Sequence, residues 1–274
     1  MIQYIVDAFT DRLFCGNQAA VCVVEKWPSD SLMLSIAKEN NFSETAYTKR
    51  NSDGTYDLRW FTPAAEIDFC GHATLATSFV ILNYYEQQAE QIVFHTRFKG
   101  DFISARTSEG ISLDFPKFNL NETDVTDQME KTFGVRPLEA YMDRDVLCVF
   151  DDEKTIRDIN PSREDLLKIG GLCVGVTAKG SGGYDCISRV FAPDIGLYED
   201  PVTGSTHCMI APYWSETLGK NEIHTFQASE RTGELLCTVK GDRVIICGKA
   251  VLFARSELNL DYLFHLYVII DIYR

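Results

Sequence analysis

Hydrophobic and polar positions in the first half of the chain predict short strands interrupted by helices. Residues 2–7 alternate in the manner of a half-buried strand, and the β-branched apolar run at residues 19–25 predicts a buried one. Ser29 can cap a following helix. Residues 71–86 carry apolar side chains at helical spacing and predict a largely buried helix. Further strands are predicted at residues 44–49, 56–61, 91–96 and 102–115.

The second half repeats this alternation of strands and helices. A helix is predicted to begin near Gly204 and to stop at Gly219, and Pro212 should kink or shorten it. A shorter helical stretch is predicted near residues 162–169. Strands are predicted at residues 173–178, 184–191, 235–240 and 243–255.

A polar and acidic segment at residues 116–128 separates the two halves. We place a domain boundary there, because such composition is typical of linkers between packed units. The predicted division is a first domain at 1–117, a second at 118–258 and an apolar tail of unknown role at 259–274.

An internal repeat links the two halves. The pattern R-x-F-x-P occurs at residues 59–63 and again at 189–193, 130 residues later. Each copy is followed by acidic residues and then by a glycine, Gly71 or Gly204, that opens a predicted helix. A period this long indicates two duplicated α+β domains. Since helix N-termini bind anions, two such helices facing each other across a cleft would hold a small acid between the halves.

Composition narrows the class of protein. Lys and Arg number 26 against 40 Asp and Glu, which gives a net charge of −14 and makes nucleic acid a poor partner. The nine cysteines are scattered and form no C-x-x-C, so neither a disulfide framework nor a zinc ribbon is predicted. The N-terminus is unlike a signal peptide and no apolar run reaches 18 residues. We expect a cytoplasmic protein without a membrane partner.

Glu44, Cys70 and His72 are the candidate reacting groups of the first half. Glu44 lies at a strand entry between Phe42 and Ala46, where a carboxylate partly removed from water can move protons, although one acid among 40 is by default a solvated surface residue. His72, at a helix start, is either a proton-transfer partner or a locally satisfied helix residue. Cys70 is either a reactive thiol at a helix N-terminus or an inert core residue.

The segment from Glu199 to His207 is the densest polar cluster in the sequence. Asp200, Thr203 and Ser205 surround Gly204, and they can cap the following helix, bind a substrate at its end, or do both. A serine hydrolase is disfavoured because G-x-S-x-G is absent. Nucleotide-binding loops and H-E-x-x-H are absent too, so no metal site is predicted.

Taken together, these segments resemble the phenazine-biosynthesis isomerase-like (PhzF-like) family. The matching blocks run in order from residue 7 to residue 207, and the two most specific are C-G-H-A-T and E-D-P-V-T-G-S. The matches comprise residues 7–10, 16–17, 19–21, 43–46, 59–63, 70–76, 188–193, 199–205 and His207.

The resemblance implies a diaminopimelate epimerase-like fold, in which two pseudo-symmetric domains each wrap strands around a central helix. It also implies a cofactor-independent isomerase that acts on a small anionic substrate, and a homodimer. The family's proton-moving residue corresponds to Glu44, and His72, Asp200 and Ser205 match other site positions. The remaining site positions, where backbone N–H groups or side chains would contact the substrate, are Cys70, Gly71, Thr203 and Gly204.

Two alternatives stay open. Related racemases use two cysteine bases, one before each helix; here Cys70 matches the first and Thr203 occupies the second, which disfavours a two-thiol mechanism but leaves a Cys70-dependent epimerase. The other alternative is a binding or regulatory protein that keeps the fold without turnover. The substrate itself is expected to be a small carboxylic acid, cyclic or similar to an amino acid.

Overall fold

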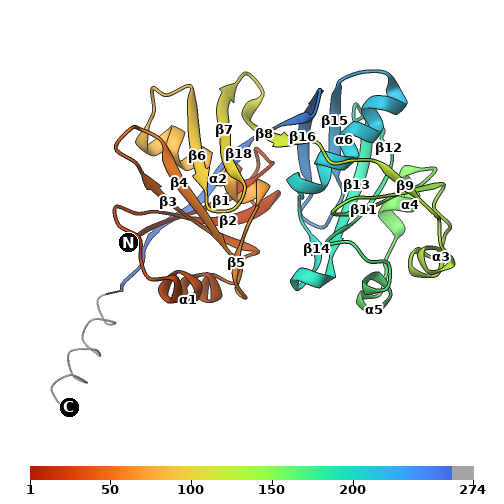
Figure 1. The fold of residues 1–274 in the computed structure, drawn as a ribbon, viewed down its shortest axis with the longest axis horizontal. Helices are drawn as coiled ribbons and strands as arrows, with labels where there is room; N and C mark the ends of the chain where they lie inside the picture. The colour runs from red at the N-terminus through yellow and green to blue at the C-terminus, as the bar shows by residue number, and fades with distance from the viewer. Residues whose placement is uncertain (261–274) are drawn as a thin grey trace, which may run out of the picture.

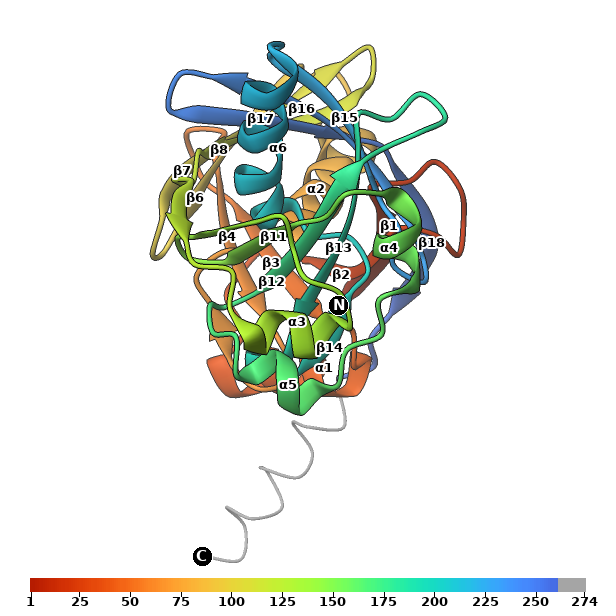
Figure 2. The same ribbon diagram turned by 90° about the vertical axis from the view of Figure 1, so that its right-hand side faces the viewer.

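Two halves of similar build lie side by side in the computed structural model, which describes residues 1–260 (Figure 1). Each half has strands curved around one central helix, α2 (Gly71–Val80) in the first and α6 (Gly204–Leu218) in the second. Figure 2 looks onto the second half and shows α6 enclosed by its strands. The eighteen strands of the described chain are hydrogen-bonded into one continuous sheet.

The first half contains eight main strands, in an order set by their pairings. Helix α1 (Asp30–Asn40), capped by Ser29 as predicted, connects β2 to β3, and β5 (Glu66–Ile67) pairs with β4. The order is β18 (Ala250–Glu257), β1 (Ile2–Ala8), β2 (Asn17–Val23), β3 (Glu44–Arg50), β4 (Tyr56–Phe61), β6 (Gln91–Thr96), β7 (Gly100–Thr107) and β8 (Gly110–Pro116).

The second half repeats this order and its strand directions. In each half the third strand is parallel to the fourth and the fifth is parallel to the sixth, and the other neighbours are antiparallel. A short strand also pairs with the fifth strand of each half; in the second half it is β14 (Leu197–Asp200). Helices α3 (Asp127–Phe133), α4 (Glu153–Asp158) and α5 (Arg163–Leu167) lie outside. The order is β9 (Asn121–Thr123), β10 (Glu139–Met142), β11 (Val146–Val149), β12 (Val174–Lys179), β13 (Cys186–Ala192), β15 (Glu222–Gln227), β16 (Gly233–Lys240) and β17 (Arg243–Gly248).

The last strand of the described chain returns to the first half. The predicted strand at 243–255 is two strands: β17 pairs with β8 and joins the half-sheets, and β18 pairs with β1. The predicted division had put residues 118–258 together in the second half, whereas β18 covers the edge of β1 that would otherwise be unpaired. The rest of the division stays a prediction, and residues 261–274 of the predicted tail lie outside the described residues.

The R-x-F-x-P repeat has the same structural role in both halves. Arg59 binds Glu66 with two hydrogen bonds of 2.7 Å, and Arg189 binds Glu199 with two of 2.8 Å. In each copy the guanidinium carbon lies 5.1 Å from the centre of the phenylalanine ring two residues further on. The repeat therefore ties each fifth strand to the short strand beside it, next to the start of the central helix.

Both central helices are buried on nearly all sides, as their apolar sequences predict. Helix α2 continues into a π-helical turn, η1 (Ile81–Tyr85). Helix α6 continues through Pro212, so of the two predicted effects the shortening is wrong, and the helix ends at Gly219 as expected. Proline cannot donate to the carbonyl of Cys208, but that carbonyl accepts a hydrogen bond of 3.0 Å from the backbone N–H of Phe118 instead.

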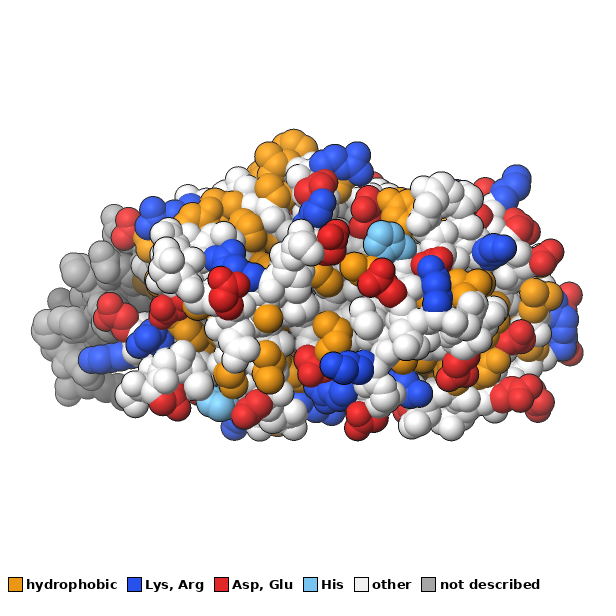
Figure 3. Space-filling model, turned by 90° about the horizontal axis from the view of Figure 1, so that it is seen from above, with side chains coloured by type: hydrophobic (Ala, Val, Ile, Leu, Met, Phe, Trp, Pro, Cys, Tyr) orange, Lys and Arg blue, Asp and Glu red, His pale blue; other side chains and the backbone are white. Residues whose placement is uncertain are grey.

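Among residues 1–260, no helix is long and apolar enough to cross a membrane. On the described part of the face in Figure 3, Lys and Arg side chains are interspersed with Asp and Glu, and no continuous basic area is seen.

Gly110 provides a test of the seam between the half-sheets, which is the pairing of β8 with β17. It has φ +143°, and an added Cβ would lie 2.4 Å from the carbonyl oxygen of Gly248, whereas Gly100, with φ +75°, has open space around it. We expect Gly100→Ala to cost about 1 kcal/mol through backbone strain alone. Gly110→Ala should cost at least about 3 kcal/mol, because it adds a clash with backbone. Urea unfolding measures both, and equal losses would contradict the described seam.

Candidate active site

The two central helices meet at their N-termini. A Cβ added to Gly71 would lie 3.3 Å from the Cα of Gly204, closer than ordinary contact, so glycine favours this close approach of the two helices. The N-cap residues are Cys70 and Thr203, and neither side chain caps its helix. The side chain of Thr203 donates instead to Asp200, so the predicted capping role is wrong for Thr203.

These two helix starts differ from the other α-helices of residues 1–260. Helices α1, α3, α4 and α5 are each capped by a Ser, Thr or Asp side chain that accepts from a backbone N–H. The free N–H groups of α2 and α6 therefore lie where two positive dipole ends converge. This arrangement favours an anion.

A cleft of about 430 Å³ opens at this point between the halves. Every predicted site residue contributes to its lining: Glu44, Cys70, Gly71, His72, Asp200, Thr203, Gly204 and Ser205. Its remaining walls are largely apolar and include Phe69, Phe98 and Leu197. The structure thus brings the eight residues together, and their individual roles stay predictions.

Glu44, His72 and Cys70 form a buried row in the first half. Glu44 is the first residue of β3, and its Oε2 lies 3.0 Å from Nε2 of His72, although the two atoms are not aligned as a hydrogen bond. The other ring nitrogen, Nδ1, lies 3.5 Å from the Cys70 sulfur. The imidazole therefore stands between the carboxylate and the thiol.

Burial and this row set the protonation of its members. Burial, reinforced by the charge of Glu44, raises the pKa of the Cys70 thiol to about 11 despite the opposing effect of His72. Burial alone would lower the pKa of His72, but its contacts with Cys70 and Glu44 outweigh this and place the pKa well above its ordinary value. Cys70 is thus a protonated thiol at neutral pH, so Glu44 is the acidic partner that remains beside His72.

Asp200 extends the site into the second half. Burial raises its pKa from 3.8 to about 6, while the charge of His72 and hydrogen bonds from Thr203 and Asn17 oppose the shift. Asn17 Nδ2 lies 2.7 Å from Asp200 Oδ1 and 3.1 Å from His72 Nδ1, so it connects the two walls of the cleft. Gln227 holds the adjoining backbone through the Asp200 carbonyl at 2.6 Å and the Thr203 N–H at 2.8 Å.

His207 belongs to the core beneath the cleft. Its side chain is completely buried, Nδ1 lies 2.7 Å from the carbonyl oxygen of Thr203, and Nε2 lies 3.5 Å from Ser188 Oγ. Burial lowers the pKa of His207 to about 4, so it is neutral at pH 7. Its match to the family pattern reflects a structural position.

Sequence reasoning missed the contact of Asn17 with the site and the charged cleft residue Arg144. Asn17 lies inside a matched block, but nothing in the sequence shows that it contacts Asp200, 183 residues away. Arg144, between β10 and β11, lines the second-half wall and lies outside every matched block. Only its charge in an acidic protein could have singled it out.

Glu44, Cys70 and His72 are also the residues that could hold a metal ion, since their ligand atoms lie within 4.8 Å of one another. Cys70, however, contacts Nδ1 of the imidazole, while Glu44 contacts Nε2 on its other side. One ion could bind all three only if the ring turned.

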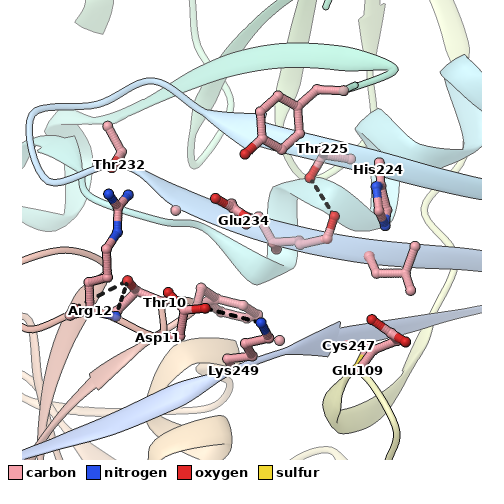
Figure 4. A pocket seen from close by; sticks show the side chains of 16 residues that line it. Thr10, Asp11, Arg12, Glu109, His224, Thr225, Thr232, Glu234, Cys247 and Lys249 are labelled. Carbon is pink, nitrogen blue, oxygen red and sulfur yellow. Dashed lines mark hydrogen bonds and ion pairs between the residues drawn. The ribbon is translucent and has the colours of Figure 1, made fainter. Parts of the chain in front are cut away.

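A second cavity, of about 120 Å³, lies between the loop after β1 and strands β15 and β16 (Figure 4). Polar side chains line it, and two of them, Asp11 and Lys249, form an ion pair of 3.0 Å. None of the predicted site residues reaches it, and it contains no helix start. The interdomain cleft is therefore the candidate active site.

Comparison with known proteins agrees with this site. A family profile described as "Phenazine biosynthesis-like protein" matches residues 6–256. An uncharacterized isomerase from Pseudomonas aeruginosa is 43% identical over 258 residues, which cover 93% of this chain and 97% of that protein. A crystal structure of a phenazine biosynthesis protein of the PhzF family from Enterococcus faecalis has a TM-score of 0.91 and 43% identity, covering 94% of this chain and 99% of the other.

A more distant structure shares the fold of this chain. A probable proline racemase from Agrobacterium radiobacter has a TM-score of 0.62 at 12% identity, covering 95% of this chain and 93% of the other, which shows a common fold alone. These comparisons show an isomerase-like enzyme with the diaminopimelate epimerase-like fold, which confirms the predicted fold class. The chain belongs to the phenazine biosynthesis-like (PhzF) family.

The pKa of Asp200 leads to a stability prediction. Because burial raises it from 3.8 to about 6, the folded state binds this proton more tightly than the unfolded state. Its stabilising effect is complete below pH 4 and is lost as the pH rises to about 6. Asp200→Asn should therefore stabilise the protein by up to about 3 kcal/mol at pH 7 and by little at pH 4.

Urea unfolding of both proteins from pH 4 to pH 8 measures this effect. The difference between variant and wild type is the informative quantity, because neutral His207 makes an opposite contribution over the same pH range. A difference that does not change with pH would contradict the raised pKa of Asp200.

Proposed function

We propose that this protein is a cofactor-independent isomerase that moves a proton between carbon atoms of a small carboxylic acid, with Glu44 as the general acid and base. The observation that carries the proposal is the state of Glu44 Oε2: it is buried at the cleft, 3.0 Å from His72, and no aligned hydrogen bond occupies it. A carboxylate oxygen held in this way can accept a proton from bound substrate.

The transfer is balanced within the site. Glu44 takes a proton from one carbon of the substrate, and the electron pair of that C–H bond delocalises through the unsaturated acid. The protonated Glu44 then returns the proton to a second carbon. His72, which lies beside the same carboxyl group, stabilises its charge when Glu44 is ionised. No external acid, base or oxidant is consumed.

The uncapped helix starts support the carboxylate part of the proposal. Free N–H groups at Gly71 and Gly204 can receive an anion although the protein carries a net charge of −14. Ser205, in the first turn of α6, adds a hydroxyl group on the same wall. An anionic substrate is therefore bound by local groups against the field of the whole molecule.

The Cys70-dependent alternative is the weaker one. With a pKa of about 11, Cys70 is a poor base at neutral pH. Thr203 at the mirrored position cannot supply a second thiol. A binding protein without turnover is distinguished from an isomerase by the first experiment below.

Two further expectations stay predictions. All nine cysteines are free thiols, which favours a reducing compartment such as the cytoplasm. The homodimer implied by the resemblance is likewise untested.

Glu44→Gln should lower substrate-dependent incorporation of deuterium at least about 100-fold. The amide keeps the shape of the side chain but cannot carry the proton, so binding should change little. Small cyclic and amino-acid-like carboxylic acids are incubated with each protein in deuterated water, and mass spectrometry reports exchange.

Asp68→Asn is the matched control for this experiment. Asp68 lines the same cleft, but its side chain is 57% exposed and pairs with Lys99, so this variant should exchange as the wild type does. Exchange that persists in Glu44→Gln would exclude Glu44 as the base. A wild type that exchanges none of the acids would favour the binding-protein alternative.

Cys70→Ser should retain exchange within about tenfold of wild type, since it removes only a weak contact with His72. If Cys70 were the base, the loss would instead exceed about 100-fold. Iodoacetamide at pH 7 gives a second readout, because a thiol with a pKa of about 11 should be alkylated slowly. Rapid alkylation that substrate prevents and that abolishes exchange would restore the Cys70 mechanism.

A further inference from the structure

Arg144 is the one Lys or Arg among the residues of the described chain that line the cleft. The same lining contains the carboxylates of Glu44, Glu66, Asp68 and Asp200. An acidic protein would not be expected to have a permanent positive charge among these carboxylates. Arg144 lies on the second-half wall of the cleft, beside the start of α6.

The guanidinium group is held in place but is not saturated. Its Nη2 lies 3.4 Å from Ser205 Oγ, and Nε lies 3.3 Å from Oδ1 of the fully buried Asp145, without an aligned hydrogen bond. The group also lies 5.6 Å from the centre of the Phe118 ring. Nη1 has no hydrogen-bond partner among residues 1–260. The Nη1 edge of the guanidinium is thus available to bind a planar anion.

The mirrored positions of the two halves explain why an anion would bind on this wall. Strand pairing sets Thr45 opposite Phe61 and Val174 opposite Phe191, so Cys173 stands where the other half has Glu44.

The helix starts differ in the same way. Thr203 and Ser205 replace Cys70 and His72. Because the Thr203 hydroxyl donates to Asp200, the Ser205 hydroxyl and the N–H groups of α6 are the donors on this wall, where the first half has the imidazole beside Glu44.

We propose that Arg144, together with Ser205 and the free N–H groups of α6, forms the subsite for the substrate's carboxylate. This inference rests on the proposed function and deepens it by assigning carboxylate recognition to the second half and proton transfer to the first. The substrate then spans the cleft, with its anionic group on Arg144 and its reacting carbons facing Glu44. Neutral amides of the same shape bind more weakly, because they bring no negative charge to the Nη1 edge of the guanidinium, which faces away from the Asp145 ion pair.

The test compares benzoate with benzamide, which have the same shape but differ in charge, as probes in calorimetric titration. Wild type should bind benzoate about tenfold more tightly than benzamide. Arg144→Gln should reduce this preference to below about threefold while leaving benzamide unchanged, and Arg144→Lys should give an intermediate value because lysine keeps the charge without the fork.

Arg157→Gln is the matched control, because Arg157 lies on α4, pairs with Glu153 and does not line the cleft. It should retain the full preference for benzoate. The proposal is overturned if wild type shows no preference, including the case in which neither probe binds, or if Arg144→Gln retains the preference. Thermal unfolding checks that the variants fold, and Arg144→Lys carries the test if Arg144→Gln does not.

The Glu44→Gln variant separates this inference from the proposed function. Glu44→Gln should keep the preference for benzoate, since it alters only the first-half wall. If Arg144→Gln loses the preference while Glu44→Gln still exchanges deuterium, the subsite stands and the assignment of the base fails. If Arg144→Gln keeps the preference while Glu44→Gln loses deuterium exchange, the assignment of the base stands and the subsite is excluded.

Discussion

The contact between Gly71 and Gly204 is the constraint on which the site depends. The two buried helices meet end to end through these glycines: a Cβ on Gly71 would be 3.3 Å from the Cα of Gly204, closer than ordinary contact, and one on Gly204 would be 3.5 Å from the Cα of Gly71. Because the side chains of Cys70 and Thr203 leave the first N–H groups uncapped, the contact concentrates two sets of free donors at one point. Every other functional side chain is placed relative to that point.

One strand crosses between the halves. β18 follows β17 of the second half but pairs with β1, so the second half of the chain completes the sheet of the first. Arg231 adds a further link, since it follows β15 in the second half and binds Asp7 of β1 at 2.8 Å. Buried apolar side chains of both halves, among them Leu75 and Cys208, also pack in one cluster, and Asn17 is held against Asp200 by a hydrogen bond of 2.7 Å.

The sequence predicted the parts of this structure that rest on local patterns and on duplication. The repeat at Arg59 and Arg189 led to two halves with central helices that face a cleft, and the polar motifs together with the family resemblance led to the eight residues that line it. What it could not predict depends on contacts between distant residues. The pairing of β18 with β1 and the bond from Phe118 to the Cys208 carbonyl are examples. Arg144 was missed for the same reason, since its position opposite the first-half acid follows only from the packing of the two halves.

Duplication followed by divergence also explains how one cleft can both hold an anion and move a proton. If the carboxylate base and the carboxylate of the bound substrate lay on the same wall, the two negative charges would repel each other. Burial would strengthen this repulsion. Here Glu44 stands next to His72, whose pKa is raised, while the mirrored position has the neutral Cys173 thiol. The second-half wall also contains the guanidinium of Arg144, and its own carboxyl group, Asp200, accepts hydrogen bonds from Asn17 and Thr203. The two like charges can therefore be accommodated at opposite ends of the same substrate, each beside its own positive group, and the acidic composition of the protein does not prevent either from binding.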